Sequence, residues 1–158
     1  MILYHGTYTD IDFIDLKKCM PCKDFGQGFY LTDIAQQAQD MAIRKSKFIA
    51  GASPCVLKFE FDESCLTDGT LQVKVFDRPT EEWAQFIIAN RYNPENKVVH
   101  HYDIVIGPIA DDGVALQIGL FRDGLIDLTA LAKALEYRKL NKQYYFGTAK
   151  AISLLKKI

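Results

Sequence analysis

The stretch Asp24-Phe25-Gly26-Gln27-Gly28-Phe29-Tyr30-Leu31-Thr32 decides our interpretation of the fold. Two glycines flank Gln27, an aromatic pair follows, and a helical pattern begins just after Thr32. Glycine frees the backbone and aromatic residues favour strands, so the stretch predicts a flexible loop, a short strand and a helix start. Such a loop lets a ligand come close to the backbone. Ordinary surface turns use the same residues, so a second signal is needed.

That second signal is Tyr4-His5-Gly6-Thr7, which ends the first apolar run of the chain. A histidine followed by a small, flexible residue stands at the end of the strand expected over residues 2–5. On its own, His5 is best interpreted as a strand-end histidine whose ring bonds a backbone carbonyl, and Tyr30 as an ordinary core aromatic residue. The two segments together point to a shared site.

Composition places the chain among soluble globular proteins. Its 158 residues are 49% hydrophobic and carry a net charge of -1, and we expect one domain over residues 1–158. No apolar run is long enough for a membrane span, and the first residues lack the features of a signal peptide. We therefore expect a cytoplasmic protein with no membrane partner. The balanced charge gives no general attraction to nucleic acid, and the basic run Arg44-Lys45-Lys47 is interpreted as a solvated helix face.

The four cysteines include one close pair, Cys19 and Cys22. This spacing occurs in redox motifs and in half of a zinc site. Zinc needs two further ligands at a matching spacing, but Cys55 and Cys65 are isolated in the sequence. A redox pair would stand at a helix start after a strand, whereas this pair lies in a loop that contains Lys and Pro. We expect reduced, structural cysteines and no bound metal.

Strand and helix patterns follow one another without a regular βαβ repeat, which favours an α+β fold over a doubly wound parallel sheet. Alternating or buried apolar runs predict strands, and apolar residues spaced three and four apart predict helices. A capping box is expected at Asp33 and Gln36, and a cap at Thr148. The expected strands cover 2–5, 29–32, 56–61, 71–76, 102–106 and 143–146, and the expected helices cover 33–47, 112–121 and 127–137, with two more beginning at 79–82 and at 148.

Together, the motif at His5, the glycine-rich loop, the strand of Tyr30 and the helix after it resemble the ADP-ribosyltransferase superfamily. The pattern is most similar to the diphtheria-toxin-type and poly(ADP-ribose)-polymerase-type branch, whose signature is a His on the first strand, a Tyr on a later strand and a Glu near the end. The chain also resembles a family of small bacterial proteins within that superfamily through Glu82-Trp83, Asn90-Arg91, Tyr102-Asp103-Ile104-Val105, Gly107-Pro108 and Gln143-Tyr144.

The resemblance implies a split, mostly antiparallel sheet with flanking helices and a cleft that holds NAD as a substrate. His5 would bond a ribose hydroxyl, and the backbone of Gly6 would meet the nicotinamide carboxamide, with Thr7 beside it as a further cofactor-binding residue. Tyr30 would present its ring to the cationic nicotinamide. The other cofactor-binding residues that the resemblance implies are Gly26 and Gly28, which let the loop close, and Phe25 as an apolar lid.

The sequence departs from the pattern at two positions. Met41 stands roughly where the toxin branch has a second aromatic residue on the helix, and a thioether packs on a ring with less specific geometry. Gln143 stands where the late-strand acid is expected. We therefore list Gln143, Tyr30 and His5 as catalytic candidates, with Glu82 as a helper acid, although an acid at a helix start also serves the helix dipole.

The resemblance implies an NAD-dependent mono-ADP-ribosyltransferase acting on an unknown protein or nucleic acid target, with NAD glycohydrolase as a possible side activity. A small bacterial enzyme of this kind would suit the toxin of a toxin–antitoxin or phage-defence pair, with an antitoxin protein as its partner. The alternative is a module that binds NAD or ADP-ribose without turnover.

Overall fold

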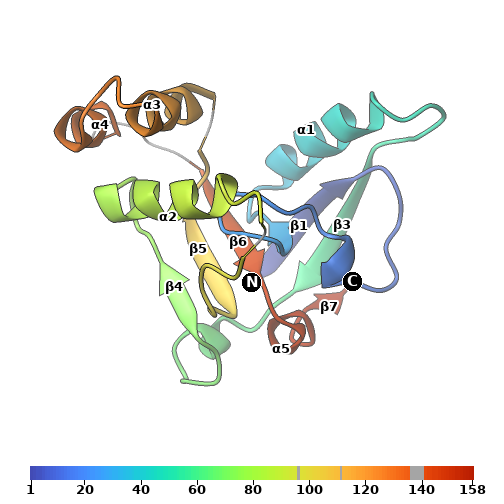
Figure 1. Ribbon diagram of the computed structural model, residues 1–158. Helices are drawn as coiled ribbons and strands as arrows, with labels where there is room; N and C mark the ends of the chain where they lie inside the picture. The colour runs from blue at the N-terminus through green and yellow to red at the C-terminus, as the bar shows by residue number, and fades with distance from the viewer. Residues whose placement is uncertain (96, 111, 136–140) are drawn as a thin grey trace.

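The computed structural model describes residues 1–95, 97–110, 112–135 and 141–158 as a mixed α+β structure (Figure 1). Expected and observed elements agree in type along most of the chain. In order, the elements are β1 (Ile2–Thr7), η1 (Leu16–Lys18), β2 (Phe29–Leu31), α1 (Ala35–Ser46), β3 (Cys55–Glu60), η2 (Glu63–Leu66), β4 (Val73–Val75), α2 (Glu81–Arg91), β5 (Ile104–Pro108), α3 (Asp112–Arg122), α4 (Leu128–Leu135), β6 (Lys142–Phe146), α5 (Ala149–Ile152) and β7 (Lys156–Lys157).

The strands form two sheets that meet at a single point. One sheet has the antiparallel order β1-β3-β7, and the other has the order β2-β6-β5-β4. Tyr4 of β1 and Thr32, just after β2, form the isolated bridge between them, with backbone N···O distances of 2.8 and 3.0 Å. The α+β class is confirmed. The parallel pairing of β4 with β5 was not predicted, and it follows from the crossover that α2 makes between these two strands.

Hydrophobic side chains of β2, β5 and β6 alternate between two cores. Because neighbouring residues of a strand point to opposite faces, each of these strands supplies both cores. The first core contains Leu3, Phe29, Leu31, Leu57, Phe59, Phe61, Leu71, Ile104, Ile106, Tyr144, Phe146 and Ala151. The second core contains Phe25, Phe76, Trp83, Ala84, Ile87, Val105, Ala110, Val114, Ile118, Leu131, Leu135 and Tyr145.

Helices cover the second-core side of the strands in two groups. In Figure 1, α1 lies along β1 and β3, whereas α2, α3 and α4 lie together at the other end of the molecule. Gly6 brings α1 close to β1, because a Cβ at that position would lie 2.1 Å from the carbonyl oxygen of Ala38. Among the described residues, no helix has the length and apolar character needed to cross a membrane.

The structure corrects one expected helix cap and confirms another. The capping box is wrong: α1 has Ile34 as its N-cap residue without a side-chain cap, and the Asp33 carboxylate instead accepts a hydrogen bond from the Tyr144 hydroxyl at 3.1 Å. Thr148 does cap α5, since its Oγ1 accepts from Ala151 N at 3.2 Å. This helix ends at Ile152, and the unpredicted β7 follows it. The expected end of α4 at 136–137 lies outside the described residues.

Candidate functional site

His5 lies where the two sheets separate. Its Nδ1 is 2.7 Å from the backbone oxygen of Tyr30, and because a carbonyl can only accept, Nδ1 carries the hydrogen. An antiparallel ladder continued from the Tyr4–Thr32 bridge would pair Gly6 with Tyr30. The imidazole binds the Tyr30 carbonyl where that pairing would occur. The interpretation of His5 as a strand-end histidine on a backbone carbonyl is therefore confirmed.

The environment of His5 keeps its ring neutral. Burial and the nearby Lys45 lower the pKa of His5 to about 4, against the opposing effect of the hydrogen bond to Tyr30. The ring stacks on Phe29, with centroids 4.4 Å apart. With the proton on Nδ1, the Nε2 lone pair is the remaining acceptor of the ring. Such a group can accept a hydrogen bond from a hydroxyl.

Three of the predicted site residues share one face of the strands, and His5 is not among them. Tyr30 pairs directly with Tyr145, and Gln143 lies two residues before Tyr145, so these side chains point to the same side. Gly6 lies on that side too, two residues from the bridged Tyr4. The His5 ring lies on the other side, against Phe29. The expectation that the rings of His5 and Tyr30 line one cleft is wrong, because alternation along the strands separates them.

The Tyr30 hydroxyl holds the glycine-rich loop in place. It donates to Gly26 O at 2.8 Å and accepts from Phe25 N at 2.9 Å. Burial is the largest cause that raises the pKa of Tyr30 well above its usual value, so the hydroxyl stays protonated. This arrangement agrees with the interpretation of Tyr30 as an ordinary core aromatic residue. Its ring lies edge-on to that of Tyr145, with centroids 5.4 Å apart.

Phe25 is not a lid. Its side chain has no exposed surface and packs in the second core against Phe76 and Phe86, with centroids 6.3 and 6.0 Å apart. The sequence expectation was wrong because a loop residue next to glycine was assumed to face a ligand. Here the loop instead places Phe25 in the second core, and burial of a Phe side chain stabilises a fold by about 1.5–3 kcal/mol.

The glycines of this loop serve close packing. Gly26 has a φ of +94°, a value that side chains disfavour. A Cβ at Gly28 would lie 2.2 Å from Cε2 of Tyr145 and 2.8 Å from Phe146 O. Gly28 is therefore required by the approach of the loop to β6. The same contacts bring the loop over the end of that strand.

The backbone of Gly6 already has a partner. Lys45 of α1 donates from Nζ to Gly6 O at 2.7 Å. Lys45 is half-buried, and desolvation lowers its pKa. The interpretation of the basic run as a solvated face holds for its exposed members Arg44 and Lys47 and is wrong for Lys45. Thr7, the next residue along β1, is buried.

Gln143 belongs to a polar cluster that joins three distant parts of the chain. Its Nε2 donates to Oδ2 of Asp24 at 3.1 Å, and Nε of Arg91 lies 2.5 Å from Oδ1 of the same carboxylate. Asp24 is only 8% exposed. Arg91 also reaches Ala110 O at 3.4 Å. We call Asp24, Arg91 and Gln143 the Asp24 cluster; it places a carboxylate beside the predicted Gln143.

Two predicted site residues lie apart from this cluster. The side chain of Glu82 is 69% exposed and forms an ion pair at 2.5 Å with Lys74, on the edge strand β4. Glu82 stands in the first turn of α2, which fits the helix-dipole role, and no described contact joins it to Gln143. Met41 is 39% exposed on α1, beside the Ala42 that packs on Gly6. No described contact joins Met41 to Tyr30.

The close cysteine pair occupies two different environments, and all four cysteines are free thiols. Burial raises the pKa of Cys19, which packs against the first core. Cys22 is exposed, has a φ of +55°, and donates from Sγ to Asn93 O at 3.5 Å. Both cysteines therefore make packing or hydrogen-bond contacts within the protein. That they bind no metal stays a prediction.

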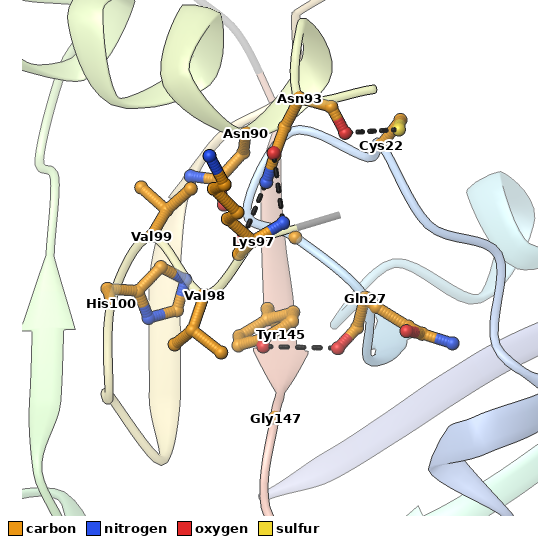
Figure 2. A pocket seen from close by; sticks show the side chains of 11 residues that line it. Cys22, Gln27, Asn90, Asn93, Lys97, Val98, Val99, His100, Tyr145 and Gly147 are labelled. Carbon is orange, nitrogen blue, oxygen red and sulfur yellow. Dashed lines mark hydrogen bonds between the residues drawn. The ribbon is translucent and has the colours of Figure 1, made fainter. Parts of the chain in front are cut away.

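A pocket of about 210 Å³ lies beside the glycine-rich loop and is lined in part by Gly26 and Gln27 (Figure 2). We call it the His100 pocket; its wall includes Gln27, Asn90, Lys97, Val98, His100 and Tyr145. His100 Nε2 donates to Phe25 O at 2.8 Å, while its Nδ1 accepts from Tyr102 N at 3.2 Å. Burial lowers the pKa of His100, so this ring too is neutral.

Sequence reasoning missed Asp24, Arg91, Lys45 and Asn90 as site residues. Asp24 opens the quoted stretch, and Asn90-Arg91 is among the motifs that carry the resemblance, so both signals were present. A charged residue beside a glycine-rich loop, or a motif with an amide and a cation, is a signal of buried polar contacts. What the sequence does not show is that these residues meet.

Comparison with known proteins identifies a family for this chain. The curated proteins and the solved structures contain no match to this chain. The model of the family described as "Protein of unknown function (DUF3990)" matches residues 1–157. Since this match covers nearly the whole chain, the protein belongs to the DUF3990 family.

Proposed function

We propose that this protein is an NAD-dependent mono-ADP-ribosyltransferase. The observation that carries the proposal is the Asp24 cluster at Gln143, on the strand face that Gly6 and Tyr30 share. The resemblance expects an acid at position 143, and the fold supplies a carboxylate 3.1 Å from the amide found there. The separation of β1 and β2 beyond the Tyr4–Thr32 bridge adds support, since the resemblance implies a split sheet.

In the proposed reaction the glycosidic bond between ribose C1′ and the nicotinamide nitrogen breaks. Its electron pair leaves with nicotinamide, and a lone pair of the target forms the new bond to C1′ while the target loses a proton. The ribose passes through an oxocarbenium-like state with positive charge. A fixed carboxylate near that charge stabilises it without reorganisation, which is the usual way an enzyme lowers such a barrier. Asp24 is the carboxylate of the cluster.

Gln143 and Arg91 would position that carboxylate. The Gln143 amide and the Arg91 guanidinium each bind a different oxygen of Asp24, which fixes the plane of the carboxylate. The carbonyl oxygen of the Gln143 amide remains an acceptor for a ribose hydroxyl. Gly6 would present its backbone to the carboxamide after Lys45 leaves its carbonyl.

The test is nicotinamide release from NAD, measured by chromatography. We expect release by the wild-type protein and a loss of about 10²-fold in Asp24→Asn, the scale for removing one electrostatic partner of a transition state. The matched control is Glu82→Gln, which removes an exposed carboxylate in the first turn of α2 and should leave release unchanged. Thermal melting of each variant separates lost chemistry from lost folding. Absence of release by the folded wild-type protein refutes the proposal.

A second candidate is a module that binds NAD or ADP-ribose without turnover. Two contacts favour it: Lys45 occupies the carbonyl of Gly6, and Arg91 pairs with Asp24 and so offsets its charge. Under this alternative, calorimetry detects NAD binding while nicotinamide release stays at the level of a protein-free sample. Asp24→Asn would then alter affinity alone.

A further inference from the structure

The His100 pocket has an unused hydrogen-bond acceptor in its wall. Asn90, in the last turn of α2, is only 4% exposed. Its Nδ2 donates to Phe86 O at 2.8 Å, which fixes the orientation of the amide and leaves Oδ1 on the side of Gly26 and the pocket. No described residue donates to this oxygen. This oxygen opens onto the pocket, so a ligand that brings an N–H group can bind it in place of solvent.

The polar side-chain atoms of His100 and Tyr145 in the wall have hydrogen-bond partners within the protein. Both ring nitrogens of His100 are engaged, and the Tyr145 hydroxyl donates to Gln27 O at 3.3 Å. These two residues therefore offer a ligand the faces of their rings and no free hydrogen-bond donor. Figure 2 shows the Tyr145 ring at the base of the pocket between Gln27 on one side and Val98 with His100 on the other. Flat, largely apolar ligand faces match such walls.

The mouth of the pocket carries a cation. The Lys97 side chain is 75% exposed and pairs at 2.5 Å with the equally accessible Glu95. An exposed pair of this kind contributes little, so an incoming anion can replace Glu95 at low cost. A volume of about 210 Å³ lies below the 300–1,000 Å³ usual for drug-sized ligands, so the pocket suits a single ring system and not a whole dinucleotide.

We propose that the His100 pocket binds a nucleobase that carries an exocyclic amino group, with the amino group donating to Oδ1 of Asn90 and the attached phosphate directed to Lys97. This inference does not depend on ADP-ribose transfer. The base can belong to a free nucleotide or to a single-stranded nucleic acid, and the two sources share the same recognition chemistry.

The experiment is calorimetric titration of the full chain with AMP. Purine riboside 5′-monophosphate, which differs from AMP only in lacking the amino group, is the matched ligand control. We expect AMP to bind and its analogue to bind about 10-fold more weakly, the scale of one hydrogen bond to a buried acceptor. Equal affinity for the two ligands, or no heat with AMP at about 5 mM, overturns the proposal. Nicotinamide binding more tightly than AMP also overturns it.

Variants locate the binding. Asn90→Ala should abolish the preference for AMP over its analogue, and Lys97→Glu should weaken both ligands by a similar factor. Lys97 is exposed, so its variant keeps the fold, and Lys58→Glu on β3 is the matched control for a change of charge elsewhere. AMP binding that survives both Asn90→Ala and Lys97→Glu refutes the assignment. A short single-stranded RNA rich in adenine that binds more tightly than AMP, with the same sensitivity to Lys97→Glu, identifies nucleic acid as the source; weaker binding identifies the free nucleotide.

Discussion

A single side chain, Gln143, decides how the proposed chemistry would work. A carboxylate at that position would stabilise the positive ribose directly, whereas the amide has no net charge and instead binds Asp24. The amide keeps the capacity to accept a hydroxyl hydrogen bond. The position therefore acts through a partner 119 residues earlier in the chain.

Gln143→Ala should lower nicotinamide release by about 10²-fold, because Asp24 loses one of its two positioning contacts and the ribose loses an acceptor. Gln143→Glu should also lower release, because an ionised carboxylate cannot donate to Asp24 and repels it. The measurement is the same chromatographic assay, with melting temperatures as the folding check. Unchanged release in Gln143→Ala would remove the cluster from the mechanism.

His5 should give the stability of the protein a dependence on pH. Its pKa is about 4 in the folded state, against an ordinary value of 6.5, so between these values the unfolded chain binds a proton that the folded chain does not. The contribution of His5 is therefore fully present above pH 6.5 and is lost as the pH falls towards 4. The difference corresponds to about 3 kcal/mol in the free energy of unfolding.

Urea unfolding at about pH 7 and about pH 4.5 measures this loss. In His5→Gln the loss between the two values should be smaller than in the wild-type protein, and His100, whose pKa is also lowered, contributes to the loss that remains. His101→Gln, at an exposed ring, is the control and should behave as the wild-type protein does. An undiminished loss in His5→Gln would show that the neutral ring is not a source of acid sensitivity.

At the scale of elements, the contact of α1 with β1 depends on the absence of a side chain at Gly6. Gly6→Ala places a methyl group 2.1 Å from Ala38 O and 2.8 Å from Ala42 N, both backbone atoms that cannot move alone. We expect a loss of at least about 2 kcal/mol in the free energy of unfolding, as in overpacked cores. The measurement is urea unfolding followed by circular dichroism.

The matched control is Gly119→Ala within α3. A Cβ at Gly119 meets no atom within 4 Å, and alanine favours a helix interior over glycine by about 1 kcal/mol. The same substitution should therefore stabilise the protein there. If both variants change stability equally, the close approach of α1 to β1 is not the cause of the Gly6 effect.

At the scale of the whole molecule, three strands with a core on each face should couple the two cores. Phe59 lies in the first core and Ile87 in the second, and both are buried. Replacing either by alanine should cost about 2–5 kcal/mol. Because β2, β5 and β6 supply side chains to both cores, each variant should shift the entire unfolding transition.

Trp83, the one tryptophan of the chain, reports on the second core by fluorescence, and circular dichroism reports on all elements. In Phe59→Ala the two transitions should shift together to lower urea concentration. A Trp83 transition that stays at the wild-type midpoint while circular dichroism shifts would show that the cores unfold independently.

The sequence by itself determined the local structure. Alternation of Leu57, Phe59 and Phe61 with charged residues predicted β3 within a residue or two, and Thr148 predicted the cap of α5. These features depend on neighbours a few positions away, through the period of a strand and the reach of a hydroxyl to a nearby N–H. The α+β class follows from the order of such elements.

The tertiary structure alone decided which polar residues meet. Glu82 and Asp24 are both carboxylates near plausible motifs, yet one is exposed beside β4 and the other is buried on Gln143 and Arg91. The choice depends on how the loop before β2 packs back over the second-core face, where Phe25 is buried and Asp24 reaches Gln143 at the start of β6. It depends also on the alternation of side chains along a strand, which places His5 and Tyr30 on opposite faces. Contacts between segments 67 and 119 residues apart are set by the packing of whole elements, and no local pattern in the sequence encodes that packing.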